Sequence, residues 1–135
     1  MLRAFFVVIT LCLFQSSLHA QEPYNALTVD HPIPSFGEYS FPNDQKIQPA
    51  KSDFHIENVI TMSNPEGERW AAVTLTNQSA GQRIFKPNQL LALFADGQRL
   101  FPMSQEHTFD ARERVTLTLY FGENNFPILS IYTRR

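Results

Sequence analysis

The sequence predicts an all-β fold, an antiparallel sandwich of about six to eight strands, with a small barrel as the less favoured variant. Three observations predict it. Apolar and polar residues alternate with period two in several runs after Ser52. Turn sequences rich in Asn, Gly and Pro separate these runs. No run with helical apolar spacing follows the N-terminal segment.

Residues 1–20 have the features of a secretory signal peptide. Arg3 precedes an apolar run from Ala4 to Phe14, and a polar stretch ends at Ala20. The apolar run is shorter than the roughly 20 residues that a helix needs to cross a bilayer. We therefore expect a mature chain that begins near Gln21, is periplasmic or secreted, and has no permanent membrane anchor.

The single cysteine, Cys12, lies inside this leader, so we expect the mature protein to fold without a disulfide. A lipid-attachment site would place a small residue before the cysteine, whereas Leu11 stands there. The mature chain keeps every basic residue except Arg3, which gives 10 against 13 acidic residues and a net charge of about −3. This balance argues against nucleic acid or an anionic membrane surface as the partner.

Residues 21–51 form a proline-rich arm, and residues 52–135 form the predicted sandwich domain. Each proline removes a backbone donor and favours extended backbone in the residue before it, which makes a helix unfavourable in the arm. The segment Ser35–Phe41 fits either an edge strand or an extended arm across the domain.

The alternating runs place six strands in the domain. In the first, Phe54, Ile56, Ile60 and Met62 share one parity, and Asn64–Gly67 forms a turn after it. The further predicted strands are Trp70–Thr76, Arg83–Phe85, Gln89–Ala95, Glu113–Phe121 and Phe126–Tyr132.

The Asp96-Gly97 pair predicts a two-residue hairpin turn. That register places Leu93 opposite Leu100 and Ala92 opposite Phe101. We expect the leucine face of the hairpin to point inward, which leaves Phe94 and Phe101 outside.

The register of the last strand stays open at this stage. If Phe121 pairs with Phe126, Ser130 faces inward and Leu129 and Ile131 lie on the opposite side. A bulge in the intervening turn would reverse that assignment.

Several segments together resemble the small secreted immunoglobulin-like domains of bacteria. They are Ala71–Ser79, Leu90–Phe94 followed by Asp96-Gly97, and Ala111–Glu113 opening Val115–Leu119. The resemblance covers about residues 55–132 and implies an immunoglobulin-like β-sandwich. It implies no particular activity, because many such domains have none assigned and a framework does not define a function.

The sequence favours a protein that is not an enzyme and holds no cofactor. No Gly-x-Ser-x-Gly motif is present, and the predicted mature chain has no cysteine nucleophile. The polar cluster Glu106, His107, Asp110 and Glu113 fits a solvated loop better than a catalytic group. A copper-type metal site is the alternative, with Met103, His107 and Glu106 as its ligands.

Asn77-Gln78-Ser79 is both a glycosylation sequon and a turn at a strand end. We favour the turn, because Asn commonly stabilises turns through its own side chain.

Aromatic residues are too numerous for all of them to fit inside a sandwich of this size. Trp70 and Tyr120 lie on the predicted outer parity, together with Phe94 and Phe101, and these four form a candidate contact patch. Alternatively, the arm covers Trp70 with Phe36, Tyr39 and Phe41. The sequence thus favours a non-catalytic binding or accessory module with an unidentified protein partner in the cell envelope. A periplasmic metal carrier or small metal-dependent protein is the alternative.

Overall fold

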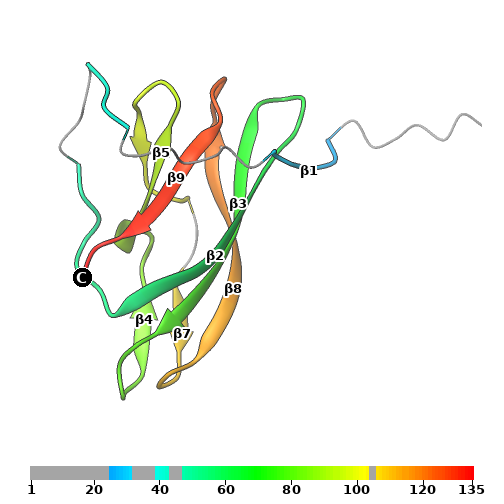
Figure 1. Cartoon of the computed structure of the whole chain (residues 1–135). Coiled ribbons are helices and arrows are strands. Elements are labelled where there is room, and N and C mark those ends of the chain that lie inside the picture. Colours follow the sequence, from blue (N-terminus) through cyan, green and yellow to red (C-terminus); the bar gives the residue numbers. More distant parts are fainter. Residues whose placement is uncertain (1–24, 32–38, 43–46, 104–105) are drawn as a thin grey trace, which may run out of the picture.

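The computed structural model describes residues 25–31, 39–42, 47–103 and 106–135, which form two layers of antiparallel strands (Figure 1). The described residues contain no α-helix, only a short 3-10 turn, η2, at Pro87–Gln89. The predicted all-β sandwich class is therefore confirmed, while the closer likeness to immunoglobulin domains stays a prediction. The predicted leader lies outside the described residues.

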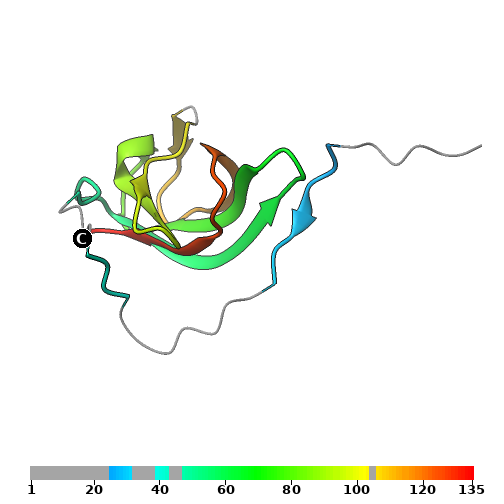
Figure 2. The same cartoon turned by 90° about the horizontal axis from the view of Figure 1, so that it is seen from above.

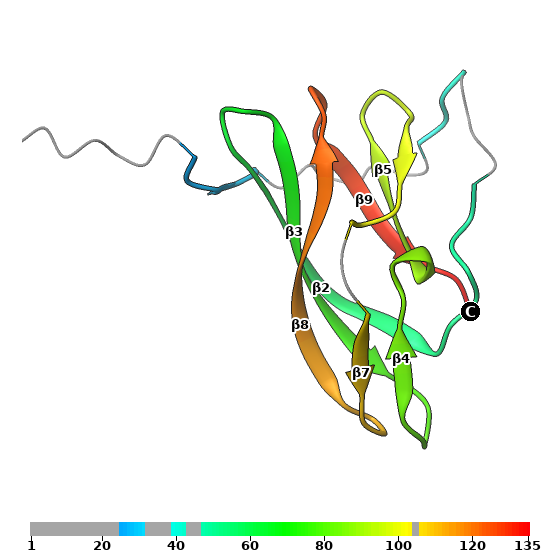
Figure 3. The same ribbon diagram turned by 180° about the vertical axis from the view of Figure 1, so that it is seen from behind.

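The first three strands along the chain lie in one layer and the next four in the other, and the last two return to one layer each. In chain order they are β1 (Thr28–Val29), β2 (Phe54–Ser63), β3 (Glu68–Asn77), β4 (Arg83–Phe85), β5 (Leu90–Phe94), β6 (Arg99–Leu100), β7 (His107–Phe109), β8 (Arg114–Glu123) and β9 (Ile128–Thr133). One layer is a four-stranded sheet in the order β1-β2-β3-β8. The other consists of β6-β5-β9 and the pair β4-β7 (Figures 2 and 3).

The core lies between the two layers, and it is rich in phenylalanine. Phe54 contacts Phe85 edge-on at a ring-centroid distance of 5.6 Å and Phe109 at 4.9 Å, which joins β2 to the β4-β7 pair. The other buried side chains of this cluster are Ala71, Val73, Leu75, Leu90, Ala92, Phe94, Leu119, Phe121 and Ile128. The apolar parity of β3 and β8 faces inward, as the alternation predicts.

A bulge in β2 reverses the side on which its residues lie. The pairing with β3 shifts between Ile56 and Asn58, so one extra residue is inserted there. Phe54 lies in the core, but Ile60 and Met62 emerge on the outer face. The predicted common parity of these residues is therefore wrong beyond the bulge.

Strand β5 presents the opposite face to the core from the one predicted. Leu90, Ala92 and Phe94 pack in the core, whereas Leu91 and Leu93 lie on the other side of the strand. All five residues are nevertheless buried. Since both faces of β5 are apolar and covered, alternation alone could not identify the inner one.

The β5–β6 connection has three residues instead of the predicted two. The amide of Phe94 donates to the carbonyl of Gln98 at 2.9 Å, and Gly97 has a φ of 85°. This is a turn followed by a glycine bulge, a common hairpin connection. Ala92 consequently pairs with Leu100 and not with Phe101.

The last strand pairs with β5 and not with β8. Its register also contains a bulge, between the pairs Leu93–Ser130 and Phe94–Ile128. Ile131 packs against the core, while Ser130 shares the outer side with Leu93. Of the alternatives left open, the hairpin across Phe121 and Phe126 is thus replaced by a crossing between the layers. The short strand β7 lies where a solvated loop was predicted.

Parts of the arm are joined to the domain by backbone hydrogen bonds. Strand β1 pairs with the end of β2, where Val29 lies opposite Met62. Pro49 is buried, and the Ala50 amide donates to the Asn88 carbonyl at 2.8 Å. Of the segment Ser35–Phe41, residues 35–38 lie outside the described part of the chain.

Truncation to alanine should destabilise the fold far more at Phe94 than at Phe101, although both side chains were predicted to lie outside. Phe94→Ala should lower the free energy of unfolding by about 3–5 kcal/mol, because it leaves a cavity in the core. Phe101→Ala, at a side chain that is 37% exposed, should cost less than about 1 kcal/mol. Urea denaturation of the two variants measures the difference, and equal losses would contradict the inward placement of Phe94.

Candidate binding face and groove

Apolar side chains form a row across the outer side of the four-stranded sheet. The register places Val29 beside Met62, Met62 beside Trp70 and Trp70 beside Tyr120, one residue from each strand. With Ile60 from the neighbouring row, we call these five residues the aromatic face. Val29 is 64% exposed and Ile60 42% exposed. The face therefore offers apolar surface to solvent from four strands that the main-chain ladder holds in place.

Trp70 and Tyr120 stack on each other at the centre of this face. Their ring centroids are 4.6 Å apart and their planes differ by 33°. Both side chains are half-buried. The indole N–H of Trp70 is buried and has no acceptor among the described residues. The structure thus brings together two of the predicted patch residues by direct cross-strand contact.

The other two predicted patch residues lie elsewhere. Phe94 is fully buried in the core, so it is not available for contact, because β5 faces the opposite way from the prediction. Phe101 is exposed but follows β6, which belongs to the other layer. The place predicted for Phe94 on the contact patch is therefore wrong, while the predicted exposure of Phe101 is confirmed.

Two carboxylates border the aromatic pair. Glu68 and Glu123 lie opposite each other at the ends of β3 and β8, next to the Trp70–Tyr120 pair. Glu68 accepts a hydrogen bond from the Asn64 amide at 2.6 Å. The neighbouring Arg69 donates to the Asn124 carbonyl and to neither carboxylate. Within the described ranges, Glu68 and Glu123 make no ion pair.

The two carboxylates act on the phenol of Tyr120. Partial burial, together with the negative charges of Glu68 and Glu123, raises the pKa of the Tyr120 phenol above its ordinary value of 10.0. The phenol is therefore neutral at physiological pH and able to donate a hydrogen bond. The electrostatic environment of the aromatic pair is negative, which favours a cation beside it.

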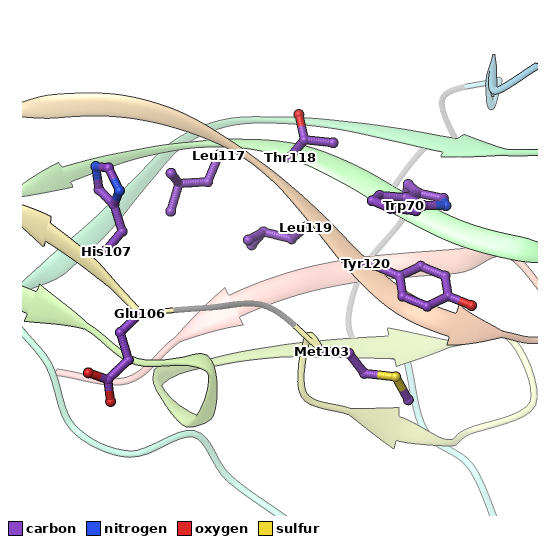
Figure 4. Close-up of a pocket in the computed structure, with 8 residues that line it drawn as sticks. All are labelled: Trp70, Met103, Glu106, His107, Leu117, Thr118, Leu119 and Tyr120. Carbon is purple, nitrogen blue, oxygen red and sulfur yellow. The ribbon is translucent and has the colours of Figure 1, made fainter.

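A groove of about 430 Å³ runs along the edge of β8 next to the aromatic pair (Figure 4). At one end, the Met103 amide donates to the Tyr120 carbonyl at 2.7 Å. The residues that line the groove are Trp70, Met103, Glu106, His107, Leu117, Thr118, Leu119 and Tyr120. It therefore opens beside the edge of β8, with Met103, Glu106 and His107 among the residues that border it.

The three alternative metal ligands, Met103, Glu106 and His107, all line this groove, but they do not converge. Figure 4 shows the imidazole of His107 and the carboxylate of Glu106 pointing in opposite directions, with Met103 near Tyr120. The His107 ring packs edge-on against Phe109 at 5.1 Å. No group of three His, Cys, Asp or Glu side chains suited to a metal occurs in the part of the chain that the structure describes.

The remaining polar residues of the predicted loop cluster serve a turn. The carboxylate of Glu113 accepts the amide of Asp110 at 2.6 Å. This bond organises the connection from β7 to β8, in which Arg112 adopts a φ of 62°. Glu113 thus stabilises the turn between the two strands.

The sequon asparagine, Asn77, is a buried turn residue. Its side-chain amide donates to the carbonyls of Gly81 at 2.9 Å and Asp110 at 2.8 Å, and its side-chain oxygen accepts the Ser79 amide. The side chain is fully buried. Modification of this nitrogen would require the loss of two hydrogen bonds, so the turn interpretation agrees with the structure.

Comparison of the chain with models of protein families, with curated proteins and with solved structures finds no match. Among the described residues, no helix has the length and apolarity that crossing a membrane requires. The candidate site is therefore defined by the geometry of this chain alone.

The Tyr120 phenol should ionise above pH 10, and Glu68→Gln with Glu123→Gln should lower its pKa towards the ordinary value. The folded state holds this proton more tightly than the unfolded chain. The tighter binding of this proton therefore stabilises the folded state fully below about pH 10. This stabilisation is lost as the pH rises through the pKa of Tyr120 in the folded state. The difference in ultraviolet absorbance titration between the protein and Tyr120→Phe isolates this phenol. An unchanged pKa in the double variant would contradict the charge effect.

Proposed function

We propose that this chain is an exported, non-catalytic binding module that holds a protein partner on its aromatic face. The observation that carries the proposal is the stacked pair Trp70–Tyr120, displayed on the outer side of a regular sheet and continued by exposed Val29 and Ile60. Tryptophan and tyrosine dominate the binding energy of many interfaces, because they bury much area at little entropic cost.

The framework supports such a role because it holds the face rigidly. Ala71, Val73 and Leu75 alternate with the outer residues of β3 and are fully buried in the core. The inner side chains therefore fix the strand while the outer ones remain available for contact. The binding surface is therefore preorganised, so binding a partner would not require the entropic cost of ordering a loop in this chain.

Export and location in the cell envelope rest on the sequence. The features of residues 1–20 favour cleavage and secretion, and the absence of cysteine after Cys12 suits a domain that depends on its core alone. The alternative of a metal carrier has no supporting geometry, since Glu106 and His107 point apart.

The test is affinity capture from envelope extract with residues 21–135 as bait, alongside two matched variants. Tyr120→Ser truncates the aromatic face, and Ile84→Ser changes an exposed apolar residue of β4 in the other layer. Loss of a central aromatic contact costs about 2 kcal/mol or more. A partner of this face should be retained by the protein and by Ile84→Ser, and lost with Tyr120→Ser.

Thermal melting of all three proteins provides the control for folding. Retention of the same partner by Tyr120→Ser would show that binding uses another surface. Recovery of nothing specific by the unaltered protein would count against the binding module itself.

A further inference from the structure

The edge of β8 carries backbone groups that face the groove. Strand β8 ends the order β1-β2-β3-β8, so only one of its sides is paired within that sheet. The Tyr120 carbonyl points away from β3, because it accepts the Met103 amide. Successive residues of an antiparallel strand direct their main-chain groups to alternate sides. Thr116 and Thr118 therefore direct their N–H and C=O groups to the same side as Tyr120, away from β3.

The strand itself lacks the residue types with which proteins usually protect exposed edges. Between Val115 and Phe121 it contains no proline, lysine or charged side chain. It is ten residues long, and the groove runs beside its central part, Leu117–Tyr120. An extended segment could therefore pair with Thr116 and Thr118, up to the point where Met103 already occupies the edge.

The charges around the groove select the chemistry of that segment. Glu68 and Glu123 stand beyond the aromatic pair, and Glu106 lies on the opposite wall of the groove. None of the three makes an ion pair within the described ranges. A side chain opposite Thr118 would lie diagonally next to Tyr120, a separation that a long side chain can cover. A cation there would face the aromatic rings and approach the carboxylates.

We propose that the partner adds an extended strand to β8 at Thr116 and Thr118 and places a lysine or arginine side chain over Tyr120 and Trp70. This inference rests on the proposed function and specifies the partner as a basic, extended peptide segment. Main-chain hydrogen bonds would supply part of the affinity, and the cation on the acidic aromatic surface would supply specificity.

The binding test uses a fluorescein-labelled peptide of about six residues, the usual strand length, in which lysine alternates with valine. A second peptide with glutamate in place of lysine is the charge control. Fluorescence anisotropy should show saturable binding of the lysine peptide, at least about tenfold tighter than that of the glutamate peptide. The affinity should fall as sodium chloride rises from about 50 to about 500 mM.

Two double variants test where the charge acts. Glu68→Gln with Glu123→Gln should weaken binding of the lysine peptide about tenfold, because it removes both carboxylates beside the aromatic pair. Glu57→Gln with Asp110→Asn removes the same charge towards the other end of the sheet, near Arg114, and should leave the affinity within about twofold. Equal effects of the two double variants would overturn the proposed place of the cation.

Amide hydrogen exchange tests the strand addition itself. In the free protein, the Thr116 and Thr118 amides should exchange quickly, while the Leu117 amide, which faces Val73 of β3, should already be protected. The lysine peptide should protect Thr116 and Thr118 by at least about tenfold and leave Leu117 unchanged. Binding without this protection would overturn strand addition.

Other outcomes separate this inference from the proposed function. If the lysine peptide does not bind, or the glutamate peptide binds equally well, the basic-strand inference fails. Capture of a partner that depends on Tyr120 would still support the binding module. If Thr116 and Thr118 become protected with rising protein concentration alone, and sedimentation shows a dimer, the edge binds a second copy and the inference is overturned.

Discussion

The antiparallel ladder between β3 and β8 fixes both the dry interior and the candidate binding surface. Ala71 lies opposite Leu119 on the inner side, and the next pair, Trp70 and Tyr120, lies on the outer side. Because side chains alternate strictly along a strand, the core cannot form in this register without placing the two aromatic rings together outside. Burial of the inner residues thus supplies the free energy that holds the outer pair in position.

Glycine-assisted irregularities complete this arrangement at the end of the ladder. The register between β3 and β8 shifts between Glu68 and Trp70, and Gly122 has a φ of 88° at this point. The shift brings Glu123 opposite Glu68, so two like charges face each other across the strands. Such a pair is unfavourable in isolation. Its position beside an aromatic pair explains why a basic partner would gain both electrostatic and cation–π energy there.

The fold class and most strands could be predicted from the sequence, because period-two alternation is strong in β3 and β8. The inner face of β5 could not, since Leu90–Phe94 is apolar on both sides and both are covered. The bulges in β2 and β9 and the three-residue β5–β6 turn were also beyond prediction, because one inserted residue changes parity without a clear local signal.

The candidate site was predictable only in part. Trp70 and Tyr120 were found from their outer parity, whereas Phe94 was misplaced with its strand. The roles of Val29, Met62 and Glu123 depend on pairing between distant segments and on two bulges, which no local pattern reveals. Met103 and His107 were noted for their chemistry, yet in the structure they matter as walls of the groove beside β8.

The central claim is that Trp70 lies on an accessible, acidic sheet face, and collisional quenching of its fluorescence tests this most directly. Trp70 is the only tryptophan of the chain, so its emission reports this site alone. The account predicts that caesium ions quench it more effectively than iodide at equal ionic strength, when each is scaled to its quenching of free tryptophan. Replacing Glu68 and Glu123 with glutamine should remove that preference. Equal quenching by both ions, or quenching by neither, would contradict the account.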